Sequence, residues 1–346
     1  MFREASIRGE NGWNKMSAAR FSLPPFQLRP NKFVDRMLFL DLVAQIAGIR
    51  GAQNYAYLSM GAKFLHDHHS VYRRVGIDNL ISFDRDGDDI KRQKFNRPTS
   101  RMTCLELDSA DLPDQIDELR GDKNVAVWLD FTSPGHRRVQ LQQSEEILKR
   151  LIPDDVFRIT LNADYKSFGK YDDNEKKKYA SVQNMAAKKL AGQIGEYLPA
   201  NLNSLSKPEF PAVLANAVSQ AASNALKYRD EIKFVPMLST TYADGSPMVT
   251  VACVVRPNDE AALPECLRDW KYRSKSWNDV LTINVPDLSI REKHFLDRKI
   301  GEPPSRIVRG LPFLPDDPDS AEEMKETIKN YKKFHRFYPA FHHIEV

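Results

Sequence analysis

VAVWLDF, residues 125–131, is the stretch that indicates the fold class of this 346-residue chain most clearly. Its apolar residues 125–129 end at Asp130, as expected of a buried strand. Four similar apolar segments accompany it, at 55–60, 79–83, 102–107 and 156–161. The intervening stretches are long enough for crossover helices, and strands alternating with helices favour a parallel sheet covered on both faces. Right-handed crossovers make a doubly wound sheet the expected arrangement.

The sequence on either side of these segments completes the predicted sheet. Residues 31–51 place apolar side chains on a broad helical face and predict a buried helix. Polar, Ala-rich sequence at 174–228 predicts two further helices. Residues 234–241 and 248–256 then flank Asp244-Gly245, a strong signal for an antiparallel hairpin. We therefore predict an α/β fold with a mostly parallel, seven-stranded sheet that ends in an antiparallel hairpin.

These patterns divide the chain into three predicted parts. Residues 1–30 form an N-terminal arm, and residues 31–256 form the main domain with a helical insertion at about 165–230. Residues 257–346 form a C-terminal extension, which we expect to mediate any contact with a protein partner. Within this extension, Ser289 and Glu292 have the spacing of a capping box, and a helix is expected at 322–337.

Composition excludes several classes of protein. The chain has 51 Lys and Arg residues against 47 Asp and Glu residues, a net charge of +4 that is too small to imply nucleic-acid binding by itself. Three widely spaced cysteines without a CxxC pair indicate neither a disulfide framework nor a zinc site, and they favour a reducing compartment. No stretch approaches the roughly 20 apolar residues of a membrane span, and the N-terminus lacks the pattern of a signal peptide. We expect a soluble cytoplasmic protein that does not contact a membrane.

Three clusters allow a functional and a structural interpretation. The HDHH sequence at 66–69 contains metal-ligating residue types, but consecutive residues on a helix point in different directions, so we expect no metal site. The basic clusters at 73–74, 91–94 and 176–178 form either solvated faces or contacts to nucleic acid. The aromatic residues at 270–277 belong to a core or interface, or they stack on bases.

Candidate site residues follow from the loops after the strands, because ligands of an open parallel sheet bind beyond its carboxyl edge. After the first strand, Ser59 and Gly61 belong to a turn that either passes close to a ligand or is an ordinary strand-to-helix connection. Asp84 ends the second strand, 23 residues after Gly61, a spacing that lets an acid accept both hydroxyls of an adenosine ribose. The alternative for Asp84 is a surface turn within an acidic run.

The third and fourth strands end in further candidates. Asp108 and Ser109 follow the third strand, where an acid or a hydroxyl can meet an adenine edge. Asp130 closes the fourth strand, and an ionised group there must face solvent, a partner or a ligand, because an unpaired buried charge is too unfavourable. A catalytic Asp130 and one that merely caps the following loop both fit this pattern.

The chain also resembles a known family in four segments: LRPNK (28–32), Gly76-Ile77 leading to ISFD (81–84), RQKFNRP (92–98) and VWLDF (127–131). Together with the order of elements, they resemble class I S-adenosylmethionine-dependent methyltransferases over residues 28–256. More narrowly, the chain is similar to bacterial O-methyltransferase-like proteins, several of which are associated with mobile or defence loci. The resemblance implies a Rossmann-like methyltransferase fold with S-adenosylmethionine as cofactor.

The resemblance also assigns roles to the candidate residues. Gly61 matches what is left of a glycine-rich cofactor loop, Asp84 the ribose-binding acid, Asp108 and Ser109 the adenine side, and Asp130 the position after the fourth strand. The implied function is methyl transfer to an unknown acceptor, which Asp130 would orient or deprotonate. The alternative is a degenerate Rossmann-like subunit that binds a nucleotide or a protein partner in a bacterial anti-phage defence complex. The retained acids favour the first function, and the single glycine favours the second.

Overall fold

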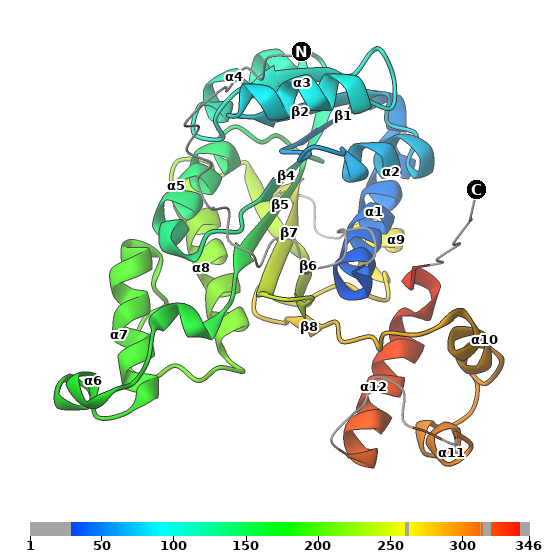
Figure 1. The fold of residues 1–346 in the computed structure, drawn as a ribbon. Coiled ribbons are helices and arrows are strands. Elements are labelled where there is room, and N and C mark those ends of the chain that lie inside the picture. The colour runs from blue at the N-terminus through cyan, green and yellow to red at the C-terminus, as the bar shows by residue number, and fades with distance from the viewer. Residues whose placement is uncertain (1–28, 260–262, 312, 314–319, 340–346) are drawn as a thin grey trace, which may run out of the picture.

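The structure of the protein is a computed structural model that describes residues 29–259, 263–311, 313 and 320–339 (Figure 1). Of the predicted N-terminal arm, residues 1–28 lie outside the described residues. Eight strands form one sheet in the order β3-β2-β1-β4-β5-β7-β6-β8. The strands are β1 (Tyr55–Ser59), β2 (Asn79–Asp84), β3 (Thr103–Glu106), β4 (Asn124–Asp130), β5 (Val156–Asn162), β6 (Ile232–Ala243), β7 (Pro247–Pro257) and β8 (Leu281–Thr282).

Strands β1 to β5 are parallel, and the sheet grows outward in two directions from the pair β1 and β4. The predicted doubly wound, mostly parallel sheet is therefore confirmed. The predicted hairpin is confirmed as well: β6 and β7 pair antiparallel up to Ala243 and Pro247, and β7 continues the sheet by pairing antiparallel with β5.

The predicted number of seven strands is wrong, and so is the predicted place of the hairpin at the end of the sheet, because β8 adds an eighth strand beyond the hairpin. Leu281 pairs with Thr240 in parallel, and the backbone N–H of Ile283 donates to the carbonyl of Thr241 at 2.8 Å. The edge of β6 is thus covered by the C-terminal extension, which satisfies backbone groups that an open edge would expose. A strand of two residues is too short to show an alternating pattern in the sequence.

Helices cover both faces of the sheet (Figure 1). They are α1 (Pro30–Arg50), α2 (His66–Arg74), α3 (Gly87–Asn96), α4 (Leu112–Arg120), α5 (Arg137–Leu148), α6 (Asp173–Lys178), α7 (Val182–Ile194), α8 (Phe210–Ala225), α9 (Glu265–Arg268), α10 (Ile290–Arg298), α11 (Pro304–Arg309) and α12 (Ala321–Phe334). Two helices are predicted at 174–228, whereas the structure has three in this region. The additional helix is the short, polar α6, whose first turn is capped by the carboxylate of Asp172. The predicted capping box of Ser289 and Glu292 begins α10.

The two faces of the sheet belong to two separate hydrophobic cores, since side chains alternate along each strand. Tyr57 and Trp128 face α1 and the C-terminal extension, whereas Leu58 and Leu129 face α5, α7 and α8. The extension contributes Trp270 and Tyr272 to the first core, where each is 8% exposed. Their predicted alternative role in base stacking is therefore excluded by burial.

Helix α1 is fixed to the sheet by a buried ion pair between Asp35 and Arg158 of β5. The other carboxylate oxygen of Asp35 accepts hydrogen bonds from Thr240 and Thr250, at 2.5 and 2.9 Å. The guanidinium of Arg158 also lies 4.2 Å from the ring centre of Trp128. A buried ion pair needs such additional partners, because desolvation of both charges opposes it.

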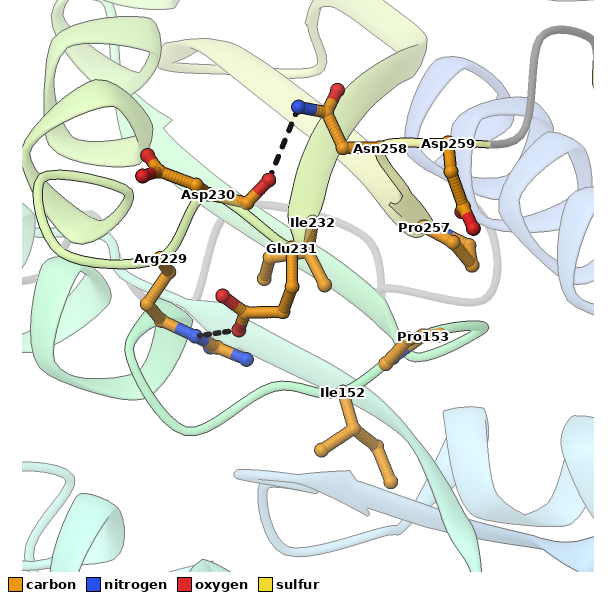
Figure 2. Close-up of a pocket in the computed structure, with 9 residues that line it drawn as sticks. All are labelled: Ile152, Pro153, Arg229, Asp230, Glu231, Ile232, Pro257, Asn258 and Asp259. Carbon is orange, nitrogen blue, oxygen red and sulfur yellow. Dashed lines mark hydrogen bonds and ion pairs between the residues drawn. The ribbon is translucent and has the colours of Figure 1, made fainter.

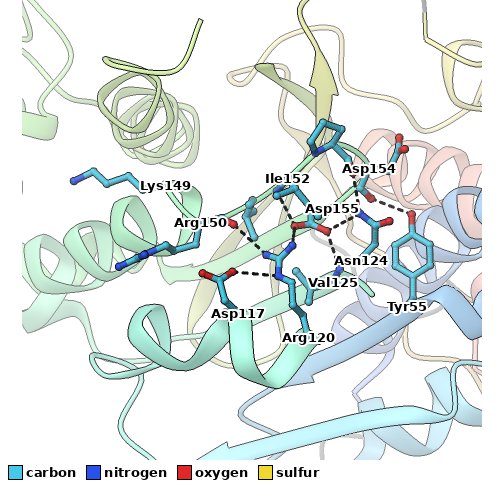
Figure 3. A network of polar contacts seen from close by, with 12 residues as sticks. Tyr55, Asp117, Arg120, Asn124, Val125, Lys149, Arg150, Ile152, Asp154 and Asp155 are labelled. Atoms are coloured by element: carbon cyan, nitrogen blue, oxygen red, sulfur yellow. Dashed lines mark hydrogen bonds and ion pairs between the residues drawn. The ribbon is translucent and has the colours of Figure 1, made fainter. Parts of the chain in front are cut away.

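A second polar network lies at the opposite edge of the sheet, where β4 and β5 begin (Figure 3). Arg120 of α4 donates to Asp155 at 2.8 Å, and the backbone N–H of Val125 donates to the other oxygen of Asp155 at 2.8 Å. Asn124 donates to the same carboxylate. These contacts fix the register of β4 against β5. They thereby also set the position of Asp130, which ends β4 at the carboxyl edge of the sheet.

Within the described part of the chain, no helix combines the length and the apolar character needed to cross a membrane. Cys104 and Cys253 are buried thiols and Cys266 is an exposed one.

Candidate functional site

A pocket of about 700 Å³ lies at the carboxyl ends of β1 to β4. This edge, beside the point where the strand order reverses, is where doubly wound sheets bind ligands. The pocket is lined by Met60, Phe83, Asp84, Arg85, Leu107, Asp108, Ser109, Asp130, Phe131, Thr132, Ser133, His136, Val139, Gln140 and Gln143. Four of the six predicted site residues, Asp84, Asp108, Ser109 and Asp130, therefore meet in one pocket.

Asp84 is the last residue of β2 and is half-buried. Its Oδ1 accepts a hydrogen bond from the backbone N–H of Asp86 at 3.0 Å, which fixes the carboxylate at the pocket wall. Burial raises the pKa of Asp84, and this hydrogen bond opposes the rise.

The loop after β3 contributes Asp108 and Ser109. Oδ1 of Asp108 accepts from the backbone N–H of Ala110 at 2.9 Å, so the carboxylate is held by its own turn. The hydroxyl of Ser109 donates to Oε1 of Gln143 on α5 at 3.0 Å. The loop is thereby joined to the first turns of the helix that follows β4.

Asp130 lies at the end of β4, beside a lysine that the sequence patterns did not single out. The ammonium of Lys32 donates to Oδ2 of Asp130 at 3.1 Å. Burial raises the pKa of Asp130, but Lys32, together with Arg36 and Arg158, outweighs this effect, and the net pKa lies below the ordinary value. Asp130 is therefore a carboxylate at neutral pH and a weaker base than an ordinary aspartate.

The position of Lys32 is set by the tip of the hairpin. Asp244 accepts hydrogen bonds from the backbone N–H groups of Asn31 and Lys32, the latter at 2.6 Å, and from the amide of Asn31 at 2.9 Å. A carboxylate at this place satisfies free donors in the first turn of α1 and matches the positive end of the helix dipole. The hairpin thus holds the start of α1 against the pocket.

Ser59 and Gly61, the two remaining predicted residues, do not line the pocket, although Met60 between them does. Gly61 has a φ of +69°, and a Cβ added there would lie 2.6 Å from the side chain of Leu65. Ala62 and Leu65 also have positive φ values, of 46° and 53°. Non-glycine residues adopt this left-handed conformation at a cost of about 1–2 kcal/mol each. The loop therefore has the backbone conformation typical of a glycine-rich loop, although two of its left-handed positions carry side chains.

The sequence reasoning missed the residues that follow Asp130. His136 lies at the pocket wall, and its Nδ1 is 3.0 Å from the hydroxyl of Ser133. Gln140 of α5 donates to the carbonyl of Ser133 at 2.9 Å. The signal was present in the sequence, because a histidine six residues after a strand-end acid, beside Pro134 and Gly135, falls in the loop that faces the ligand edge.

Three aspartates, Asp84, Asp108 and Asp130, line the pocket against one arginine, Arg85. Two of its oxygens, Oδ1 of Asp130 and Oε1 of Gln140, are buried without a hydrogen-bond partner among the described residues. A buried polar atom is normally paired, so these oxygens indicate a ligand that carries donors or positive charge.

A second pocket, of about 850 Å³, lies at the opposite edge of the sheet, beside the starts of β5 and β6 (Figure 2). Its arginine, Arg229, donates to Glu231 at 3.0 Å and to the carbonyl of Leu151 at 2.8 Å. The positive charge of Arg229 is thus engaged by the protein itself. We therefore place the candidate site at the carboxyl edge.

The histidine side chains of the HDHH sequence (66–69) contact different neighbours and do not converge on one point. His68 is buried with Nε2 3.0 Å from the carbonyl of Ile81, and Nε2 of His69 lies 2.8 Å from the carbonyl of Asn96. Among the described residues, no group of three or more His, Cys, Asp or Glu side chains could hold a metal ion.

A family model described as "Putative O-methyltransferase" matches residues 24–346 of this chain. No curated protein matches the sequence of this chain. The family match therefore covers the main domain and the C-terminal extension together.

Solved structures match this chain at low identity and low TM-score. A DUF574 family protein from Streptomyces avermitilis is 11% identical, with a TM-score of 0.37, over 64% of this chain and 83% of that chain. An S-adenosylmethionine-dependent methyltransferase from Anabaena variabilis is 10% identical, with a TM-score of 0.35, over 69% and 90%. TrmK from M. capricolum, in complex with S-adenosylhomocysteine, is 11% identical, with a TM-score of 0.33, over 87% and 97%.

Proposed function

The chain belongs to the Putative O-methyltransferase family, and from this premise we propose that it transfers a methyl group from S-adenosylmethionine to a hydroxyl acceptor. The observation that carries the proposal is the pocket at the carboxyl edge, into which β2, β3 and β4 each bring a carboxylate. The strand order, with an antiparallel hairpin inserted next to β5, is that expected of the methyltransferase fold.

The residues of the pocket fit this cofactor. S-adenosylmethionine carries a sulfonium, an ammonium, an adenine amino group and two ribose hydroxyls, so it is rich in donors and positive charge. For the cofactor the pocket supplies the carboxylates of Asp84 and Asp108 and the buried Oε1 of Gln140, which has no partner among the described residues. Asp84 would hold the ribose hydroxyls, and Asp108 with Ser109 would face the adenine. When bound, the cofactor supplies an electrophilic methyl group.

The chain itself must orient the acceptor and exclude water. Asp130 stays ionised because of Lys32 and the more distant Arg36 and Arg158, so it would hold a donor group by a charge-assisted hydrogen bond rather than take up a proton. Phe131 and Val139 provide apolar surface in the same pocket. Holding the reactants in place in this way accounts for much of the acceleration of a bimolecular transfer.

His136 is the candidate for removing the proton of the acceptor. Imidazole is the side chain whose ordinary pKa lies closest to neutral pH, and His136 lies at the pocket wall. The hydroxyl of Ser133, 3.0 Å from Nδ1, would fix the orientation of the ring so that Nε2 remains available for the acceptor. We assign His136 this role in preference to Asp130.

Calorimetry tests the proposal most directly. Wild-type protein is titrated with S-adenosylmethionine and with S-adenosylhomocysteine, and saturable binding of both is expected. His136→Gln should retain this affinity while losing methyl transfer, measured with radiolabelled cofactor against cell extracts as the source of acceptor. Absence of binding in folded wild-type protein would overturn the proposal.

The alternative function, a degenerate subunit that binds a nucleotide or a partner in a defence complex, predicts a different result. Such a subunit would bind S-adenosylhomocysteine, a nucleotide or a protein partner without transferring a label to any acceptor. Equal activity of wild type and His136→Gln would likewise remove His136 from the proposed mechanism.

A further inference from the structure

We propose that the exposed surface of α2 and α3 binds single-stranded nucleic acid. The α2–α3 surface consists of Phe64, Tyr72, Arg73, Arg92, Phe95 and Arg97, all of which are exposed. This binding goes beyond methyl transfer and does not depend on it.

The first support for this proposal is the distribution of charge. Residues 91–101 contain five basic residues and no acidic residue. Lys91 pairs with Asp88 at 2.8 Å, whereas Lys94, Arg97 and Arg101 have no carboxylate within ion-pair distance among the described residues. The positive charge is therefore concentrated at the end of α3 and just beyond it, as a contact to phosphates requires.

The second support is the exposure of aromatic rings among these cations. The side chain of Phe95 is 89% exposed, that of Phe64 48% and that of Tyr72 36%. The guanidinium of Arg92 lies 4.7 Å from the ring centre of Phe64. Exposed rings beside exposed cations are the arrangement that stacks on unpaired bases while the cations contact the backbone.

The two helices are held together, so that these groups form one surface. The amide of Asn96 at the end of α3 donates to the carbonyl of Lys63 at 2.8 Å, and Nε2 of His69 lies 2.8 Å from the carbonyl of Asn96. Tyr72 and Arg73 follow His69 by three and four residues, which places them on the side of α2 that faces α3.

The surface also adjoins the candidate site. Gln93 of α3 donates to the carbonyl of Met60 at 3.2 Å, and Met60 lines the pocket. A single strand lying along α3 would therefore pass the loop that borders the pocket. A folded duplex would leave the exposed ring of Phe95 without a stacking partner, so a single strand fits better.

The test measures fluorescence anisotropy with labelled 20-nucleotide single-stranded RNA and DNA of mixed sequence, without cofactor, at several salt concentrations. Phe95→Ala should weaken binding at least about fivefold, because stacking on one base is removed. The matched control is Tyr228→Ala, which removes a ring that is 87% exposed beside Lys227, in the segment that precedes β6. The control should bind like wild type.

A second pair of variants tests the charges. Arg92→Gln with Arg97→Gln should reduce the slope of log affinity against log salt by about 1.4, because each phosphate that an arginine no longer neutralises lowers this slope by about 0.7. Lys177→Gln with Lys178→Gln removes the same charge from α6 and should leave the slope unchanged.

Three results would overturn the proposal. They are the absence of oligonucleotide binding, with or without binding to phosphatidylserine vesicles; an equal decrease of affinity in Phe95→Ala and Tyr228→Ala; and an equal decrease of the salt slope in the arginine and lysine double variants. Because no cofactor is present, failure here leaves the calorimetric test of methyl transfer unaffected. Conversely, loss of oligonucleotide binding in Phe95→Ala with unchanged cofactor affinity would support the surface as an independent site.

Discussion

Nζ of Lys32 lies 3.1 Å from Oδ2 of Asp130, and this ion pair joins the first turn of α1 to the end of β4. Asp244 at the hairpin tip fixes the backbone of Lys32. Three segments that are distant in sequence therefore determine the charge of one carboxylate in the pocket. A change in any of them is expected to alter the site without unfolding the sheet.

Replacing Lys32 with Met should raise the pKa of Asp130. Lys32 is the principal group that lowers this pKa against the effect of burial, so its removal leaves burial opposed mainly by the more distant Arg36 and Arg158. Carbon-13 NMR titration of the carboxyl groups measures the change, with the Asp130 signal assigned by its absence in Asp130→Asn. Lys176→Met on the exposed α6 is the control, and an unchanged Asp130 titration in Lys32→Met would contradict this role.

Replacing Asp84 with Ala should weaken binding of S-adenosylmethionine at least about tenfold. The change removes an acceptor of charge-assisted hydrogen bonds, which contribute about 1.5–3 kcal/mol each. Calorimetry compares this variant with Asp122→Ala, which removes an exposed carboxylate from the opposite edge of the sheet. Unchanged affinity in folded Asp84→Ala would exclude Asp84 as the ribose-binding acid.

Much of the fold could be predicted because its signals are local. The Asp-Gly pair at 244–245 identified the hairpin, and five apolar segments identified the parallel strands. The two-residue β8 could not be predicted, since it exists only because the extension reaches the edge of β6. The polar α6 was missed for a related reason: six residues without an apolar face show no helical period.

The candidate site could be predicted in part. Parallel strands end at one edge, so strand-end acids such as Asp84 and Asp130 could be expected to meet. The pairing of Lys32 with Asp130 joins residues that are 98 positions apart, and no local pattern in the sequence predicts it. The left-handed backbone at Ala62 and Leu65 could not be predicted either, because residues with a Cβ rarely adopt positive φ values.

Breaking the buried ion pair of α1 should destabilise the protein strongly. Asp35→Ala leaves the guanidinium of Arg158 buried without its carboxylate, at a cost of about 3–5 kcal/mol. The double variant Asp35→Ala with Arg158→Met should lose less stability than Asp35→Ala or Arg158→Met alone, because neither charge remains buried. Urea denaturation measures these differences, with Asp173→Ala at an exposed pair on α6 expected to change stability by less than about 1 kcal/mol. Additive effects in the double variant would contradict the coupling.

Replacing Asp130 with Asn should reduce methyl transfer while changing cofactor affinity little. Asparagine keeps the shape of the side chain and one acceptor oxygen, but it removes the charge that would hold the donor group of the acceptor. The measurement pairs calorimetry with transfer of label in the same purified variant. Full activity of Asp130→Asn would show that the acceptor is positioned without this charge.

Stability should fall as pH is lowered from about 6.5 to 4, because His68 is buried. Burial lowers the pKa of His68 to about 4, although the contact with the carbonyl of Ile81 and the nearby Asp67 oppose this. An unfolded histidine has a pKa of about 6.5. Below that pH the unfolded chain binds a proton that the folded chain does not, so the stabilisation present at neutral pH is lost progressively as pH approaches 4.

The total effect is about 3 kcal/mol at most, since each unit of pKa difference corresponds to about 1.4 kcal/mol. Urea denaturation at a series of pH values measures it in wild type and in His68→Gln, whose amide can still donate to Ile81 but does not titrate. His294→Gln on the exposed side of α10 is the matched control and should keep the wild-type slope. A slope between pH 6.5 and 4 that is identical in wild type and His68→Gln would mean that other groups cause the pH dependence.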